Sequence, residues 1–272
     1  MTLATISALN IYPLKSARGI PRSQVRLWAT GFEWDRHWLI VDARHHFITQ
    51  RTHPQLARIE TAVTEQALTL SAPQLAPFVL STEPAGTPVR VQIWKDTVDA
   101  LDQGATAAAW VSEAVGEALR LVRVPSISRR LADQTYTGTE IAPVAFADGY
   151  PVLICNRASL EDLNTRLPEP LPMERFRPNL VLEGLPAFAE DRIASIRIDD
   201  VTLALVKPCT RCVITSTDQR TGIRSNNPLP VLRTFRYDST LHGVKFGENA
   251  IVRSGFGSTL ERGAQCTVDF DN

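Results

Sequence analysis

Short stretches in which apolar and polar residues alternate recur along the chain, and this period of two is typical of β-strands with one buried face. In the first hundred residues the strand pattern covers TISALNIY (5–12), WDRHWLIVD (34–42) and VRVQIW (89–94). The segment HFITQRT (46–52) is placed to return as the hairpin partner of 34–42. Five stretches in the second half also have strand character: FRPNLVLEG, IASIRI, VTLALVK, NAIVRS and AQCTVDF.

Two segments change from a strand period to a helical one. Apolar residues spaced by three and four predict a helix over 106–119, with Thr106 as its N-cap. The stretch NRASLEDLNTRL (156–167) predicts a second helix, with Ser159 as its cap and a stripe of leucines. Many strands with few helices favour a mostly β fold of the α+β class, with β-barrel-like architecture and helical inserts.

Composition and charge narrow the class of protein. The 272 residues include 29 basic and 29 acidic side chains, and this balance argues against a general nucleic-acid binder. The N-terminus lacks the basic and apolar regions of a secretory signal, and no uncharged stretch approaches the ~18 residues of a membrane span. Four cysteines are few for this length. We therefore expect a soluble, cytoplasmic protein with reduced thiols that binds neither nucleic acid nor membrane.

The stretch KPCTRCVITSTDQRTG (207–222) holds a closely spaced cysteine pair, Cys209 and Cys212. A zinc site needs four ligands, usually as two such pairs, and only one pair is present. A thioredoxin-like dithiol begins a helix, whereas VITST after Cys212 is β-branched. Two buried structural thiols are a further interpretation. The last is one thiolate that binds a soft or high-valent metal inside an organic cofactor, with nearby basic residues lowering the thiol pKa.

Basic residues in three other segments raise the question of an anionic ligand. Arg36 would share one face of strand 34–42 with tryptophans, with Asp35 on the opposite face, so it either covers the tryptophans or reaches an anion. Lys15 and Ser16 follow a predicted strand, where a turn can cradle phosphate, although such pairs are often only solvated. In MERFRPN (173–179), two arginines would alternate along an extended segment, as an edge strand with ion pairs or as ligand contacts.

Several segments together resemble one known family, the MOSC-domain molybdenum-cofactor proteins, and within it the amidoxime-reducing branch with its bacterial YcbX-type members. The resemblance spans about Ile6 to Val268. It implies an N-terminal MOSC β-barrel region, residues 1–123, packed on a MOSC β-barrel domain, residues 124–272, with a pyridoxal phosphate binding-like site. The segments that carry it are YPLKS, GFEWDRHWLIVD, ITQR, PVAFADGYPVLICNRASLEDLN, FRPNLVL and KPCTRCVITSTDQRTG.

The resemblance also implies a set of site residues. Cys212 would be the molybdenum ligand and the catalytic residue. The cofactor would be Mo-molybdopterin, with Glu248 departing from the glutamine of the family pattern. The cofactor-binding residues carried over by position are Thr210 and Arg211 at the pterin or its tail, Lys15, Ser16 and Arg36 at the phosphate, Arg177 and Asn179 at the pterin, and Asp148, Gly149, Tyr150 and Asn249 in the same wall.

The implied activity is the two-electron reduction of N-hydroxylated compounds such as amidoximes. This chain has no C-x4-C-x2-C run for a plant-type iron–sulfur cluster, so we expect electrons from a separate protein, a ferredoxin or a flavoprotein reductase. Two alternatives stay open from the sequence: a cofactor carrier or sulfur-transfer protein without turnover, and a thiol-disulfide redox protein that uses the cysteine pair.

Overall fold

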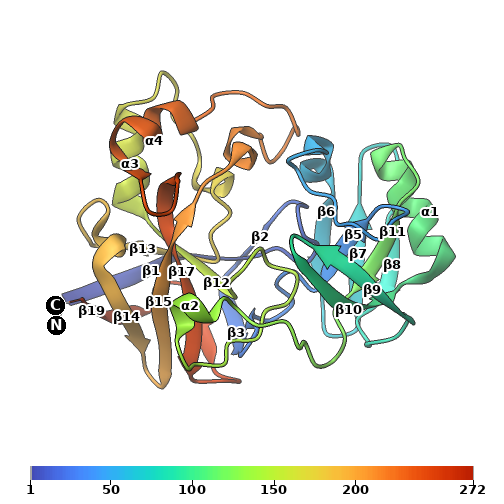
Figure 1. Ribbon diagram of the computed structural model, residues 1–272, viewed down its shortest axis with the longest axis horizontal. Helices are drawn as coiled ribbons and strands as arrows, with labels where there is room; N and C mark the ends of the chain where they lie inside the picture. The colour runs from blue at the N-terminus through green and yellow to red at the C-terminus, as the bar shows by residue number, and fades with distance from the viewer. Residues whose placement is uncertain (1, 272) are drawn as a thin grey trace.

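A computed structural model describes residues 2–271, which form two β-rich lobes (Figure 1). One lobe is a closed barrel, because β12 pairs in parallel with β13 at one edge and antiparallel with β17 at the other. In spatial order its seven strands are β12 (Val152–Asn156), β13 (Leu180–Glu183), β1 (Thr2–Ile11), β19 (Gln265–Phe270), β14 (Ile193–Ile198), β15 (Val201–Thr210) and β17 (Gly243–Ser254). Two short strands pair antiparallel with members of the barrel: β2 (Ile20–Arg22) with β1, and β16 (Tyr237–Asp238) with β17.

The second lobe combines two small sheets with the longest helix, α1 (Gly104–Val115), which packs against strands of both (Figure 1). One sheet has the order β5 (Trp38–Val41), β11 (Arg120–Arg123), β10 (Asp96–Asp102), β9 (Thr87–Ile93). The other has the order β6 (Glu60–Val63), β7 (Ala67–Ser71), β8 (Phe78–Ser81). A third sheet, of β18 (Thr259–Glu261), β3 (Gln24–Trp28) and β4 (Gly31–Phe32), lies beside the barrel.

The mostly β fold class predicted from the sequence is confirmed, and the alternation of side chains explains the strands. In β14, Ile193, Ile196 and Ile198 are buried, while Arg197 between the last two is exposed. One continuous apolar core runs through both lobes, from Ile6 in the barrel to residues of α1 and β11. The two lobes therefore share a core, because apolar side chains from both pack into one cluster that excludes water. The predicted division at residue 123 stays a prediction.

Both predicted helices exist, with different ends. The predicted cap residues are wrong: Gln103 precedes α1, and Asn156 caps α3 by accepting from the backbone N–H of Ala158. Ser159 is buried and donates to Glu190 instead. The other helices are α2 (Gln134–Thr137), α3 (Arg157–Thr165), α4 (Leu229–Phe235) and the 3-10 turns η1 (Pro54–Arg58), η2 (Met173–Arg175), η3 (Ala189–Arg192) and η4 (Val213–Ser216).

The predicted strand 34–42 is shorter than expected. The segment 46–52 returns beside it as predicted but forms only isolated bridges, with Phe47 opposite Val41 and Ile48 N–H donating to the Ile40 carbonyl. Trp34 and Arg36 have left-handed φ values of 66° and 53°, so the alternation of faces begins only at Trp38. Tertiary hydrogen bonds override the strand propensity, because Arg36 N–H donates to the Tyr12 carbonyl and the Asp35 carboxylate accepts from Tyr12 N–H.

The chain begins in the barrel, leaves it for the second lobe and returns to it at β12. Residues 12–16 make the first crossing, where Lys15 N–H donates to the Trp38 carbonyl at the edge of the second lobe. Because β1 pairs with β13 and β19, residues from the start of the chain also lie against strands of the second half. Across residues 2–271, every helix is too short or too polar to traverse a lipid bilayer.

Closure of the barrel through β1 makes its buried side chains important for stability. Ile6 is fully buried on β1, whereas Leu3 on the same strand is 60% exposed. We expect Ile6→Ala to lower the free energy of unfolding by about 2–5 kcal/mol, because it removes buried methyl groups and leaves a cavity. Leu3→Ala is the matched control and should change it by less than about 0.5 kcal/mol. Denaturant titration followed by circular dichroism measures both; equal effects would contradict the placement of β1.

Candidate functional site

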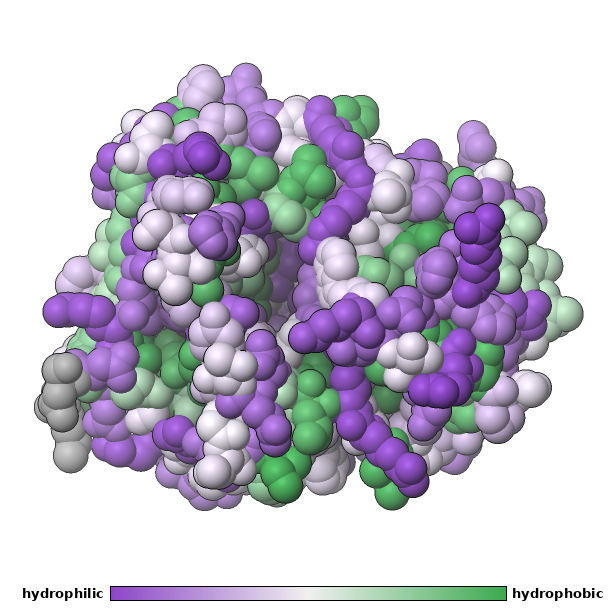
Figure 2. Space-filling view, in the orientation of Figure 1, coloured by the Kyte–Doolittle hydropathy of each residue, from purple (hydrophilic) through white to green (hydrophobic). Residues whose placement is uncertain are grey.

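A cavity lies between the two lobes, where the molecular surface is hollowed (Figure 2). All twelve site residues expected from the resemblance line it: Lys15, Ser16, Arg36, Asp148, Gly149, Tyr150, Arg177, Asn179, Thr210, Arg211, Cys212 and Asn249. They come from the first crossing, the turn before β5, the loop before β12, the loop before β13, the end of β15 and β17. Their roles in binding stay predictions.

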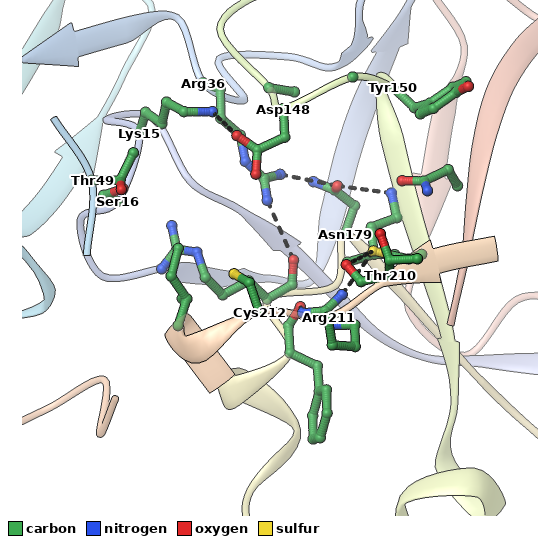
Figure 3. Close-up of a pocket in the computed structure, with 18 of the residues that line it drawn as sticks. Lys15, Ser16, Arg36, Thr49, Asp148, Tyr150, Asn179, Thr210, Arg211 and Cys212 are labelled. Carbon is green, nitrogen blue, oxygen red and sulfur yellow. Dashed lines mark hydrogen bonds and ion pairs between the residues drawn. The ribbon is translucent and has the colours of Figure 1, made fainter. Parts of the chain in front are cut away.

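The centre of one wall is an ion pair between Lys15 and Asp148 (Figure 3). Lys15 Nζ donates to Asp148 Oδ1 at 2.6 Å and to the Phe146 carbonyl at 2.7 Å, and Arg51 Nη2 donates to Asp148 Oδ2 at 3.2 Å. Burial lowers the pKa of Lys15 to about 8, against the attraction of Asp148. Burial alone would raise the pKa of the Asp148 carboxyl, but Lys15 and Arg51 hold it well below its usual range. Asp148 is therefore ionised at neutral pH.

Arg36 is held from several sides at the floor of the cavity. It donates to Asp35 Oδ2 at 2.5 Å, to Asn179 Oδ1 at 3.0 Å and to the Arg177 carbonyl at 3.3 Å. Its guanidinium also lies 4.2 Å from the centre of the Tyr12 ring. The expectation that Asp35 points away from Arg36 is wrong, because both residues lie in a turn and not in a strand.

Arg177 packs on the same aromatic ring, with its guanidinium 4.3 Å from the centre of Tyr12. It donates to the Ala17 carbonyl and to Gln219 Oε1, each at 2.8 Å. Burial lowers its pKa to about 10, which leaves the side chain charged at neutral pH. The segment around it is a 3-10 turn followed by a left-handed residue, so the predicted extended segment with alternating arginines is wrong.

The amide of Asn179 is used within the protein. Its Oδ1 accepts from Leu153 N–H at 3.1 Å as well as from Arg36, and its Nδ2 donates to the Asn10 carbonyl at 3.2 Å. Asn179 is almost completely buried. These contacts fix the position of the Arg36 guanidinium, in addition to placing the amide in the cavity wall.

Cys212 follows the end of β15 and has extended backbone angles before η4. Its sulfur points into the cavity, as Figure 3 shows. Thr210 and Asn249, on paired strands, line the wall next to it. All four cysteines are free thiols. Within residues 2–271, no cluster of three His, Cys, Asp or Glu side chains could hold a metal ion, so the zinc interpretation lacks its ligands.

Cys209 also lines the cavity but has a different environment. Arg211 Nη1 donates to its sulfur at 2.9 Å, and Arg211 Nη2 donates to the Phe176 carbonyl at 2.6 Å. Burial raises the pKa of the Cys209 thiol and outweighs the attraction of Arg211. The raised pKa argues against the use of Cys209 as a reactive dithiol partner.

Left-handed backbone conformations gather at this cavity. Ser16, Arg36 and Arg177 have φ values of 70°, 53° and 56°. Arg177 also precedes Pro178, which restricts its backbone further. Each such conformation costs about 1–3 kcal/mol and persists only where surrounding contacts determine it, a property typical of functional sites.

Sequence reasoning missed Thr49 and Arg51, which line the cavity, with Arg51 in contact with Asp148. Arg51 packs its guanidinium 4.5 Å from the centre of the Trp94 ring. The signal was present, because both residues belong to or adjoin the ITQR segment (48–51) that carries part of the resemblance.

Two protein-family models match most of this chain. The model of the MOSC N-terminal beta barrel domain matches residues 3–118, and the model of the MOSC domain matches residues 142–263. The two matches define a MOSC-domain protein that carries both parts in one chain.

Within this class, mitochondrial amidoxime-reducing components are similar to most of this chain. Mitochondrial amidoxime-reducing component 1 of Mus musculus is 34% identical over 93% of this chain and 78% of its own length. Mitochondrial amidoxime reducing component 2 of Homo sapiens is 34% identical over 86% of this chain and 73% of its own length. The YUAD protein of Bacillus subtilis matches all of this chain and 98% of its own, at 10% identity and a TM-score of 0.43. The chain belongs to the MOSC-domain family that includes the amidoxime-reducing components.

Glu248, where the resemblance leads us to expect glutamine, is buried beside the site on β17. Burial, assisted by Asp191, raises the pKa of its carboxyl to about 9. The group is therefore protonated at neutral pH, and a neutral carboxylic acid has the shape of an amide with one donor. The departure from the pattern is thus a small change in the folded protein.

This protonation has a consequence for stability. Between the ordinary glutamate pKa near 4.5 and the folded value near 9, the native state binds the extra proton, so stability falls as pH rises through this window. We expect Glu248→Gln to remove that loss and to raise stability at pH 8, relative to the wild type, by roughly 3–4 kcal/mol more than at pH 5. Urea titrations of both proteins at the two pH values test this. A constant difference between them would show that Glu248 is ionised when folded.

Proposed function

We propose that this protein binds the molybdenum cofactor in the cavity between its lobes and reduces N-hydroxylated compounds with electrons from a separate donor protein. The observation that carries the proposal is the cavity itself, in which the thiol of Cys212 and a group of cationic side chains face the same space in a chain of this family.

The charge of the cavity fits an anionic ligand. Its lining, within the described residues 2–271, has five cationic side chains and a single carboxylate, that of Asp148. Two buried donors there, Arg51 Nη1 and Arg211 Nε, have no hydrogen-bond partner in that part of the chain. Unpaired buried donors are costly, and an anion with several oxygens would satisfy them. Lys15, Ser16 and Arg36 are the residues we assign to the phosphate.

The thiol of Cys212 fits the metal. Thiolates are ligands of soft and high-valent metal centres, and Cys212 is half-buried at the cavity wall. Thr210, Arg211, Arg177 and Asn179 are assigned to the pterin and its tail, and Asp148, Gly149, Tyr150 and Asn249 to the remaining wall.

When bound, the cofactor would supply the two electrons that, with two protons, convert an N-hydroxyl group into N–H and water. The residues of this chain would bind and orient. Tyr12 supports the two arginines that pack on its ring, and Asp148 fixes the ammonium group of Lys15. Because these groups are positioned before a ligand arrives, binding costs little reorganisation.

The first test removes the proposed metal ligand. We expect protein purified from a host that makes the cofactor to hold stoichiometric molybdenum, Cys212→Ala to lose nearly all of it, and Cys209→Ala, the matched control, to keep most of it. Elemental analysis by mass spectrometry measures the metal. Full loading of both variants would overturn the assignment of Cys212.

The second test separates catalysis from storage of the cofactor. With a chemical reductant in place of the donor protein, we expect the metal-loaded protein to reduce benzamidoxime to benzamidine, measured by liquid chromatography. Loaded protein without turnover would favour the cofactor carrier instead. Disulfide reduction by metal-free protein would favour the thiol redox protein, which the raised pKa of Cys209 already disfavours.

The identity of the donor, a ferredoxin or a flavoprotein reductase, and the cytoplasmic location are predictions of the sequence. The curated relatives are mitochondrial by name.

A further inference from the structure

The segment that joins β11 to α2 contributes one buried cation near the site, Arg130, whose side chain is 7% exposed. Arg130 is absent from the lining of the candidate cavity among residues 2–271, so a ligand there would not touch it. Its backbone carbonyl accepts from Val144 N–H, and the Ser128 hydroxyl donates to the Val144 carbonyl. The joining segment thus runs along the loop that leads to Asp148.

The guanidinium of Arg130 donates to three carbonyls of that loop. Nη1 donates to Ala147 at 2.5 Å and to Ala145 at 3.3 Å, and Nη2 donates to Asp148 at 2.8 Å. Its Nε donates to Asp96 Oδ2 on β10 at 3.0 Å. Arg130 therefore connects the loop to the second lobe.

Lys15 Nζ donates to the one carbonyl of residues 145–148 that Arg130 does not contact, that of Phe146. All four consecutive carbonyls of residues 145–148 accept hydrogen bonds from these two cations. The loop is not a helix or a strand, so its carbonyls lack the partners that regular structure provides. Its shape is set by where the two cations lie.

We propose that Arg130 is a positioning residue of the candidate site. It holds loop 145–148 so that the Asp148 carboxylate stays against Lys15 and Arg51, and these two cations keep the geometry in which they bind an anion. For the nature of the anion, this inference rests on the proposed function. The positioning of loop 145–148 by Arg130 is independent of that function.

The joining segment offers a matched control. Arg129 is exposed and carries the same charge one residue earlier. If Arg130 acted only through bulk positive charge, Arg129→Ala would weaken anion binding as much as Arg130→Ala. If Arg130 acts by holding carbonyls, only its own removal has this effect, and Arg130→Lys retains a part of it, since lysine donates without the planar fork.

The experiment uses the full chain in its metal-free form, with inorganic phosphate as the probe. Hydrogen–deuterium exchange by mass spectrometry follows amides in residues 145–150, and calorimetry gives the phosphate dissociation constant. We expect Arg130→Ala to raise both the loop exchange rate and the dissociation constant about tenfold, Arg130→Lys to fall between, and Arg129→Ala to match the wild type. Unchanged loop exchange and phosphate affinity in Arg130→Ala would overturn the proposal.

A second variant covers the case in which Arg130→Ala does not fold. Asp96→Asn leaves Arg130 in place but removes the charge that anchors its Nε, and we expect a smaller change in the same two measurements. A lower melting temperature with both measurements at wild-type values would mean that Arg130 has only a structural role, which also overturns the proposal. Lack of molybdenum in the wild-type protein would refute the proposed function and leave the loop measurement valid.

Discussion

The candidate site depends on the ion pair between Lys15 and Asp148, which lie 133 positions apart in the chain. A buried ammonium group is costly unless a charge and hydrogen bonds replace its water. Asp148 and the Phe146 carbonyl supply both, and Asp148 is in turn fixed by Arg51. The pair therefore joins the first crossing of the chain to the loop before β12, and it determines where the cations of the cavity can lie.

Other features of the cavity also fix the positions of its cationic side chains. The ring of Tyr12 supports two guanidinium groups that would otherwise repel each other at close range, and Asp35 offsets part of their charge. Left-handed residues at Ser16, Arg36 and Arg177 are tolerated because the shared core of the two lobes and these polar contacts determine the backbone around them. The result is a site assembled from remote segments before any ligand binds, at a cost in folding free energy.

Local patterns were sufficient for six of the seven barrel strands, since alternation such as that of IASIRI depends on near neighbours alone. The strand that closes the barrel, β12, was not among the predicted strands. The site residues came from the family resemblance, and all of them line one cavity. The turn at residues 34–36 and the pairing of Asp35 with Arg36 were missed because their cause, the contact with Tyr12, is distant in sequence. Arg130 had no motif, because its function depends on loop carbonyls that carry no side-chain signature.

The place of β1 between β13 and β19 also constrains how the protein is made. Thr2 pairs with Val268, and Thr5 pairs with Glu183, so β1 leaves the ribosome well before either of these partner strands has been made. Until β13 and β19 are made, β1 can pair with β2 only at Leu9–Ile11, and the rest of its edges stay open to wrong pairing. Such long-range closure is slow, and it makes the nascent polypeptide a natural client for chaperones that shield exposed strands.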